Sequence, residues 1–352
     1  MDLSLFYFAD EASAGKQRYR LLLEGARFAD AHGFAAVWTP ERHFHPFGGR
    51  YPNPAVTGAA VAAVTERVAV RAGSVVAPLH HPARIAEEWS VVDNLSDGRA
   101  GVAFASGWHV SDFVLRPDAY ACRKEVVVET VQAVRRLWRQ DSVPFVDGAG
   151  QPVEVRTFPP PVQPELPMWL TSAGTLDTFR TAGELGTGLL THLLGQELQD
   201  LAHKIAVYRE AFDTHHPDRR GRAHVVLMVH ALVGEDREVV REVVREPFCA
   251  YLRSSISLIA RAVAGPATGF DPAKLRPTDV DFLVRRSFDR YFDTGGIFGT
   301  VADGVRIIAE IAKLGVDEVA CLIDFGLPHD TVLSGLEGLD DVRRAALTSA
   351  TG

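Results

Sequence analysis

Short apolar, β-branched runs alternate along the chain with longer segments whose apolar residues recur at helical spacing. Runs such as Val68–Val76 and His224–Val233 are apolar almost throughout, which is typical of strands that are covered on both faces. Segments such as Gln17–His32 and Pro82–Leu95 follow the helical period and end at glycine or at Ser-Asp-Gly. The pattern predicts strands at Leu3–Phe8, Ala35–Thr39, Val68–Val76, Gly101–Ala105, Met168–Thr171, Gly188–Thr191, His224–Val233 and Val316–Ile323, and helices at 17–32, 54–65, 82–95, 120–139, 175–185, 197–215 and 330–347.

Strands that alternate with helices favour a parallel sheet, because parallel neighbours need a helical crossover. We therefore expect a closed (β/α)8 TIM barrel, with an open, doubly wound sheet as the alternative. Two stretches exceed what a barrel needs and are expected to be insertions after strands four and seven. Residues 142–167 are predicted to form a loop with a hairpin around Asp147-Gly148, and residues 234–299 two or three helices. A single domain over residues 1–352 is expected, since such barrels often exceed 250 residues.

Composition and charge exclude several classes of protein. Hydrophobic residues make up 47% of the chain, which argues against disorder. A net charge of −8 without a long basic run argues against nucleic-acid binding. No apolar run is long enough to span a membrane and no signal peptide is evident, so a cytoplasmic protein is expected. The cysteines, Cys122, Cys249 and Cys321, fit no metal-ligand spacing and are predicted to be buried, reduced thiols.

Histidines gather after the predicted strands, where TIM barrels carry their catalytic groups. One hypothesis is a metal site, because His43-x-His45 follows a strand. The pair follows strand two, however, and the adjacent His80 and His81 can rarely reach one ion together, so we expect no metal. The alternative for each histidine is a hydrogen bond to loop backbone. The histidines in question are His43, His45, His80, His81, His109 and His192.

A small turn, Ser172-Ala173-Gly174-Thr175, connects the fifth strand to its helix. Free backbone N–H groups and the helix dipole at such a turn favour an anion, and phosphate above all. Thr175 could instead serve only as an N-cap residue. Because no G-x-G-x-x-G or P-loop pattern follows a predicted strand, neither a Rossmann nucleotide site nor a P-loop is predicted.

Several segments together resemble the luciferase-like flavin monooxygenases over nearly the whole chain. They are GFAAVWTPERHF, VRAGSVVAPLHHPARIAEEWSVVDNLSDGRAGVAFASGW, PMWLTSAGTLDTFRTAGELG and FGTVADGVRIIAEIAKLGVDEV. More narrowly, SGWHVSDF, THLLGQ and RTFPPPVQ resemble the subgroup found in polyketide and nonribosomal-peptide pathways.

The resemblance implies a flavin in the mouth of the barrel. FMN would place its phosphate on Ser172, Ala173, Gly174 and Thr175. The bond Gly73–Ser74 matches a non-proline cis peptide that lies against the flavin ring, and Ser106 and Gly107 match the loop beside the ribityl chain and phosphate. His192, at the end of strand six, is also expected to contact the cofactor. A separate NAD(P)H:flavin reductase would supply reduced FMN, and O2 would be the oxidant.

The chain departs from luciferase at two positions. Arg42 stands where luciferase has a histidine considered a base, and an arginine cannot take that role near neutral pH. Light emission is therefore not expected, and His43 becomes the candidate for proton transfer, with Arg42 beside it in the catalytic group. Ser106 stands where luciferase has an arginine for the phosphate, so another cation or more backbone donors must compensate.

The leading hypothesis is an FMN-dependent monooxygenase that hydroxylates a small molecule or a carrier-bound intermediate in natural-product biosynthesis. An F420-dependent oxidoreductase and a non-catalytic flavin-binding relative are the alternatives. The SGWH and THLLGQ segments favour the monooxygenase. The expected partners are a flavin reductase, a small-molecule or carrier-protein-tethered substrate, and a second copy of the chain in a homodimer.

Overall fold

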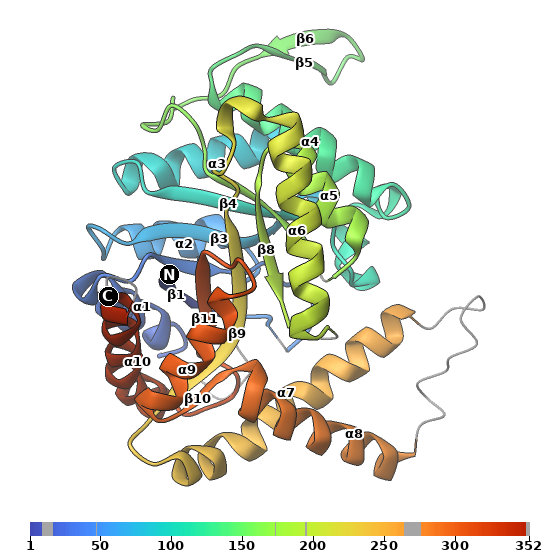
Figure 1. The fold of residues 1–352 in the computed structure, drawn as a ribbon. Helices are drawn as coiled ribbons and strands as arrows, with labels where there is room; N and C mark the ends of the chain where they lie inside the picture. The colour runs from blue at the N-terminus through green and yellow to red at the C-terminus, as the bar shows by residue number, and fades with distance from the viewer. Residues whose placement is uncertain (9–16, 47, 173, 194–195, 264–275, 350–352) are drawn as a thin grey trace.

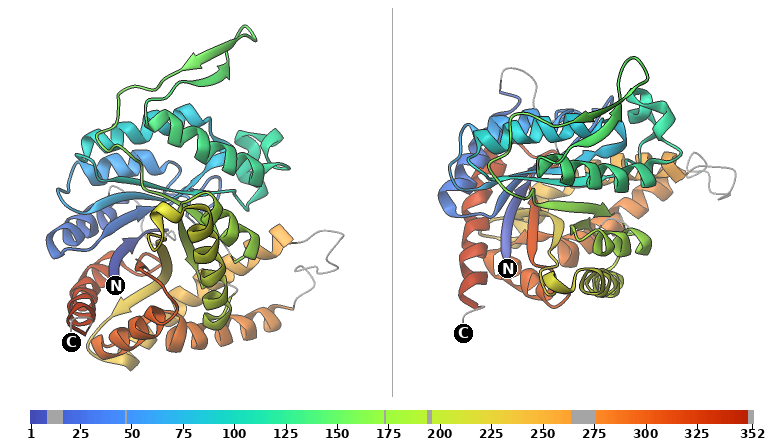
Figure 2. Two further views of the ribbon diagram at one scale, coloured as in Figure 1. Left: turned by 45° about the horizontal axis from the view of Figure 1, so that its top comes forward. Right: turned by 90° about the horizontal axis from the view of Figure 1, so that it is seen from above.

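A closed barrel of eight parallel strands forms the centre of the protein (Figures 1 and 2). The computed structural model describes residues 1–8, 17–46, 48–172, 174–193, 196–263 and 276–349. Hydrogen bonding between the eighth strand and the first, in the register Asp2↔Glu318, closes the sheet and rules out the open, doubly wound alternative. The barrel strands are β1 (Asp2–Phe6), β2 (Ala36–Thr39), β3 (Ala69–Val76), β4 (Ala100–Ala105), β7 (Met168–Ser172), β8 (Gly188–His192), β9 (Val225–Val233) and β11 (Glu318–Leu322).

Helices surround the barrel and follow the predicted segments closely. The third helix has the predicted bounds, whereas the first begins at Arg20 because residues 17–19 form a turn. These helices are α1 (Arg20–His32), α2 (Pro54–Ala62), α3 (Pro82–Leu95), α4 (Arg123–Trp138), α5 (Leu176–Glu184), α6 (Leu198–His215), α9 (Val301–Ala312) and α10 (His329–Ser349). Short 3-10 turns, η1 (Ala77–Leu79), η2 (Val110–Leu115), η3 (Pro117–Ala119) and η4 (Pro217–Arg219), lie in the connections.

Helix α9, in the seventh βα unit, was not predicted from the sequence. Its start is well defined, because Thr300 Oγ1 accepts a hydrogen bond from the backbone N–H of Asp303 while the Asp303 carboxylate accepts one from the backbone N–H of Thr300. This reciprocal capping box satisfies two donors that the helix cannot. The signal was present in the sequence as Thr300 followed three residues later by an acidic residue.

The first insertion contains the predicted hairpin. Strands β5 (Val143–Val146) and β6 (Pro152–Val155) pair antiparallel around a turn in which Gly150 N–H donates to the Asp147 carbonyl at 3.0 Å. The hairpin projects away from the barrel in Figures 1 and 2.

The second insertion contains the predicted helices and one strand that was not predicted. Helices α7 (Arg237–Val263) and α8 (Pro277–Arg290) lie side by side in Figure 1, and the π-helix η6 (Tyr291–Gly295) continues α8. Strand β10 (Ile297–Gly299) pairs in parallel with the last residues of β9, outside the closed barrel. Three residues are too few for an alternating pattern, which is why the expectation of helices alone was wrong.

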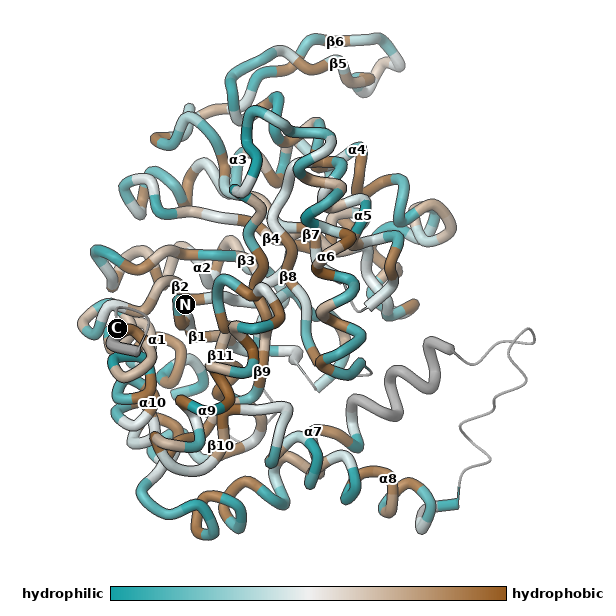
Figure 3. The backbone as a smooth tube through the Cα atoms, in the orientation of Figure 1, coloured by the Kyte–Doolittle hydropathy of each residue, from teal (hydrophilic) through white to brown (hydrophobic). Residues whose placement is uncertain are grey.

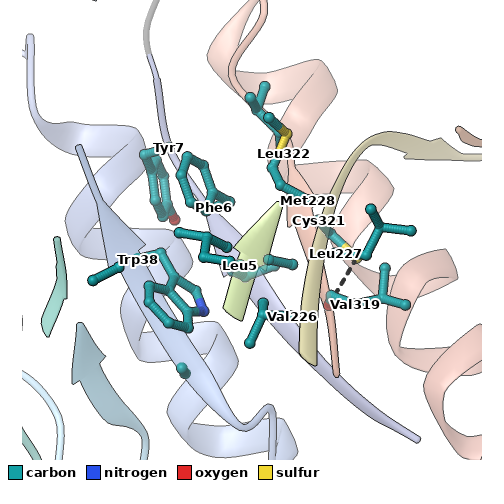
Figure 4. Packing of buried hydrophobic residues seen from close by; sticks show 14 of the residues in the cluster. Leu5, Phe6, Tyr7, Trp38, Val226, Leu227, Met228, Val319, Cys321 and Leu322 are labelled. Carbon is teal, nitrogen blue, oxygen red and sulfur yellow. Dashed lines mark hydrogen bonds between the residues drawn. The ribbon is translucent and has the colours of Figure 1, made fainter. Parts of the chain in front are cut away.

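Apolar side chains from the strands fill the interior. Figure 3 shows hydrophobic residues along the barrel strands and mixed character along the helices, and Figure 4 shows side chains of β1, β2, β9 and β11 in contact. Cys249 and Cys321 are buried, as expected. Cys122 is exposed, contrary to expectation, because it lies in the loop just before α4.

A buried ion pair crosses the amino-terminal half of the barrel. Arg71 Nη1 on β3 lies 2.7 Å from Glu318 Oε2 on β11, and its guanidinium carbon lies 4.9 Å from the centre of the Trp38 ring and 4.7 Å from that of the Trp169 ring. Glu318 Oε1 also accepts hydrogen bonds from Ser4 Oγ and Trp38 Nε1. Burial would raise the pKa of Glu318, but the Arg71 charge and the Ser4 hydrogen bond bring it below its ordinary value. Because this end of a TIM barrel is remote from catalysis, the pair contributes to stability.

Replacing Arg71 by methionine is expected to lower the free energy of unfolding at pH 7 by about 3–5 kcal/mol, the usual cost of leaving a buried charge unpaired. A depressed carboxyl pKa stabilises the fold above the unfolded pKa and loses this effect as pH falls through the folded pKa. The difference in the free energy of unfolding between variant and wild type should therefore be smaller in acid than at pH 7. Urea unfolding at pH 7 and near pH 4 measures both values. Arg84→Met, which removes the exposed pair with Glu88, is the control and should cost at most about 1 kcal/mol.

Candidate functional site

Glu41 is the centre of a hydrogen-bond cluster where β2 ends. Its side chain is fully buried. Its Oε1 accepts a bond from His43 Nε2 at 2.8 Å and another from His80 Nε2 at 2.6 Å, while Oε2 accepts the backbone N–H of Val76 at 2.7 Å. A carboxylate that accepts from Nε2 fixes the tautomer of a neutral imidazole, so Nδ1 of His43 becomes the acceptor nitrogen of its ring.

The hydrogen bonds to Glu41 shift the pKa values of Glu41 and His80 in opposite directions. Burial would raise the pKa of Glu41, but the hydrogen bonds from His43 and His80 bring it below its ordinary value. Burial would likewise lower the pKa of His80, but the hydrogen bond and the charge of Glu41 raise it. Glu41 is therefore a stable anion that orients His43, an arrangement typical of a base held by a third group.

Arg42 lies beside this cluster in an ion pair of its own. Its side chain is 2% exposed, and Nη1 donates to Asp112 Oδ2 at 3.0 Å. Asp112 Oδ1 also accepts from His109 Nδ1 at 3.0 Å, and the Trp108 ring lies 4.9 Å from the guanidinium carbon. Burial lowers the pKa of Arg42 below its ordinary value, and the charge and hydrogen bond of Asp112 offset this only in part. Nε and Nη2 of Arg42 have no hydrogen-bond partner in the described part of the chain.

The peptide bond Gly73–Ser74 on β3 is cis, as the resemblance implied. The pairing of β3 with β4 shifts register between Gly73 and Val75. Ser74 Oγ lies 2.5 Å from Thr171 Oγ1 on β7, although β4 separates the two strands, so both side chains reach the barrel interior. A Cβ at Gly73 would lie 2.6 Å from the Phe6 ring, and only glycine fits there.

Ser106 and Gly107 follow β4 directly, at the same barrel end as Glu41. Gly107 has φ +73°, and a Cβ there would lie 2.8 Å from Val76 and 2.9 Å from Phe113. The chain therefore turns sharply against β3 at this point, and no larger residue fits at Gly107.

The turn after β7 leaves backbone donors open. Ser172 Oγ accepts the N–H of Gly174 at 3.2 Å, and Gly174 has φ +114°. Thr175 occupies the N-cap position of α5, but its side chain makes no capping bond and instead contacts Thr178 Oγ1 at 2.8 Å. Thr175 is thus the N-cap residue of α5, but it does not cap the helix with its side chain, so the first N–H groups of α5 keep their capacity for an anion. Ala173 lies outside the described residues.

Gln196, in the loop before α6, and Lys204, on α6, lie against this turn. A Cβ on Gly174 would lie 3.2 Å from Gln196 Oε1 and 3.4 Å from Lys204 Nζ, so the glycine leaves a small cradle beneath them. Lys204 Nζ donates to Gln196 Oε1 at 2.9 Å, and Gln196 Nε2 donates to Thr191 Oγ1 and to the carbonyl of His192. Backbone donors, hydroxyls and an ammonium thus surround the cradle, a set that fits a phosphate.

The structure groups the predicted residues into two clusters. Arg42 and His43 lie over β2 to β4, whereas Ser172, Gly174, Thr175 and His192 lie over β7 and β8. Ser74 links the two sides inside the barrel through Thr171. Four residues that the sequence analysis did not single out belong to these clusters: Glu41, Asp112, Gln196 and Lys204. Only Glu41 carried a local signal, as an acidic residue just after a strand. The other three residues lie in separate segments of the chain, which only the fold places beside these clusters.

Neither a metal centre nor a membrane span is found where the structure can be described. Over residues 1–349, apart from the short ranges that are not described, no three His, Cys, Asp or Glu side chains are placed to share a metal ion. In the same part of the chain, no helix combines the length and the apolar character that crossing a bilayer requires.

This barrel and its polar mouth define a luciferase-like enzyme. The chain belongs to the luciferase-like monooxygenase family, whose profile matches residues 1–318. It is 27% identical to the oxygenase component of a flavin-dependent trigonelline monooxygenase from Acinetobacter baylyi, over 96% of this chain and 93% of that protein. The chain is thus a flavin-dependent monooxygenase.

Solved structures share the fold. Monooxygenase RslO1 from Streptomyces bottropensis has a TM-score of 0.79 and 21% identity, with 97% of this chain and 98% of that chain covered. The oxygenating constituent of 3,6-diketocamphane monooxygenase from Pseudomonas putida, in complex with FMN, has a TM-score of 0.73 and 17% identity over 97% and 96%. An F420-dependent glucose-6-phosphate dehydrogenase from Amycolatopsis mediterranei is 30% identical over 53% of this chain and 58% of that protein.

Proposed function

We propose that this protein is the oxygenase component of a two-component system, which takes reduced FMN from a separate NAD(P)H:flavin reductase. The cradle beneath Gln196 and Lys204 carries the proposal, because it offers phosphate a glycine turn, open helix donors and a cation in one place. The oxygenase relative aligned over 96% of the chain favours O2 chemistry, whereas the F420-dependent relative aligns over 53%.

Each cluster has a separate task in this proposal. Bound reduced flavin would supply the electrons that activate O2. Ser172, Gly174 and Thr175 would hold the phosphate, while Gly73, Ser74, Ser106, Gly107 and His192 would line the rest of the flavin. Glu41 would hold His43 with Nδ1 as the acceptor, so that this nitrogen can take a proton from substrate or flavin. Arg42, paired with Asp112, keeps a fixed positive charge next to His43.

The class of substrate is proposed from the narrower resemblance of three segments. The SGWHVSDF, THLLGQ and RTFPPPVQ segments support hydroxylation of a small molecule or carrier-bound intermediate in natural-product biosynthesis. We also propose that the chain acts as one cytoplasmic domain and pairs as a homodimer.

Incubation with FMN, a flavin reductase, NADH and candidate substrates is expected to give products heavier by one oxygen atom. The added atom should come from labelled O2, since a monooxygenase transfers one atom of O2 to substrate and reduces the other to water. Mass spectrometry with 18O2 measures this directly. The matched reaction without O2 should give no product. If the substrate is oxidised without O2 in the presence of F420 and is not oxidised with FMN, the protein is instead an F420-dependent oxidoreductase.

A further inference from the structure

Lys204 is a cation that lies beside the open turn after β7. It lies in the second turn of α6, half-buried, and its Nζ would lie 3.4 Å from a Cβ on Gly174. Residue 204 and residue 174 are thirty positions apart in the sequence. Only the packing of α6 beside α5 brings the ammonium to the start of α5, where Thr175 leaves the backbone donors uncapped.

The ammonium has no anionic partner in the part of the chain that the structure describes. Its recorded contact is a hydrogen bond to the neutral amide oxygen of Gln196 at 2.9 Å. A lysine ammonium has three donors, so two of them lack an acceptor among the described residues. Asp177, in the first turn of α5, forms no ion pair with it; its carboxylate is 89% exposed and lies 3.4 Å from Arg180. A half-buried charge without an opposite charge beside it is costly, and an anion that binds next to it would remove this cost.

Gln196 keeps the ammonium in place. Its Nε2 donates to Thr191 Oγ1 at 3.1 Å and to the carbonyl of His192, so that its Oε1 is turned toward Lys204. Thr191 Oγ1 in turn donates to the carbonyl of Ser172, the first residue of the turn, at 2.9 Å. One chain of hydrogen bonds therefore connects the turn to the lysine that faces it, and the position of Nζ does not depend on a freely moving side chain.

We infer that Lys204 is the cation for the phosphate of the bound flavin and sets the preference of this protein for a flavin that carries a phosphomonoester. This inference rests on the proposed function. Lys204, on α6, would supply the positive charge beside Gly174, where the uncapped start of α5 supplies backbone donors.

The test compares reduced FMN with reduced riboflavin, which lacks the phosphate. Affinities of wild type, Lys204→Met and Lys204→Arg are measured by anaerobic titration calorimetry. Lys204→Met is expected to weaken FMN binding by about 10- to 100-fold, equal to about 1.4–2.8 kcal/mol, and to leave riboflavin binding within about twofold. Lys204→Arg should keep most of the preference for FMN. Lys313→Met, which removes an exposed lysine paired with Glu310 on α9, is the matched control and should change neither affinity.

The outcomes separate the two proposals. If wild type prefers FMN and Lys204→Met keeps the same FMN-to-riboflavin ratio, the phosphate has another cation and the inference is wrong, while the proposed function stands. If Lys204→Met weakens both flavins equally, the lysine supports the fold of the site and the inference is also wrong. A lower midpoint of thermal unfolding in Lys204→Met than in wild type identifies that loss of structural support. If wild type binds neither flavin, both proposals fail.

Discussion

Replacement of His43 by alanine is expected to lower product formation by roughly 10²–10⁴-fold, the usual contribution of a general acid or base. FMN binding should persist, because His43 contacts Glu41 and the phosphate cradle lies over other strands. H2O2 release should rise, since O2 that is reduced without oxidising substrate leaves as peroxide. Rapid kinetics with pre-reduced FMN, together with a peroxide assay, measures all three quantities.

Two further variants distinguish proton transfer from simple support of the loop. His43→Gln can still donate an N–H to Glu41 but cannot take a proton, so it should be as inactive as His43→Ala if His43 moves a proton. Recovery of turnover in His43→Gln would show that the histidine only braces Glu41. His80→Ala removes the other histidine on Glu41 Oε1 and serves as the matched control, with a smaller expected loss of turnover. Normal turnover and coupling in His43→Ala would leave His80, His81, His109 and His192 as candidates.

Replacement of Gly174 by aspartate is expected to weaken the binding of reduced FMN by more than tenfold. The Cβ of the new aspartate would stand 3.2 Å from Gln196 Oε1 and 3.4 Å from Lys204 Nζ, so its carboxylate would lie in this site, repel the phosphate and neutralise the ammonium. Charge-assisted hydrogen bonds of roughly 1.5–3 kcal/mol each would be lost. Anaerobic titration with FMN and riboflavin should show a larger loss for FMN.

The backbone at Gly174 requires a control, because φ +114° is unfavourable for any other residue. Gly174→Ala carries the same strain without the charge and should weaken FMN less than Gly174→Asp. Gly150→Asp introduces aspartate at φ +78° in the β5–β6 hairpin, where a Cβ meets nothing within 4 Å, and should leave binding unchanged. Unchanged FMN affinity in a folded Gly174→Asp protein would place the phosphate elsewhere.

The sequence by itself determined the barrel and the end at which the candidate site residues gather. Hydrophobic runs and helical periods located all eight barrel strands, because burial on both faces leaves a strand little freedom in composition. Element ends were less accurate, since the last hydrogen bonds depend on neighbouring strands. Tyr7, for example, was predicted within the first strand but follows its end, although its N–H still donates to the carbonyl of Trp38. Local patterns also located the Ser172–Thr175 turn, because its donors come from adjacent residues.

Only the tertiary structure decided which side chains act together. Glu41 contacts His80 from the loop after β3, and Arg42 contacts Asp112 from the η2 turn after β4. Lys204 reaches the turn at Gly174 from a different helix. None of these pairs leaves a pattern in one sequence, because a hydrogen bond between distant residues constrains position in space and not spacing along the chain. The sequence specifies where each strand delivers its residues, and the closure of the barrel determines the partners that they meet there.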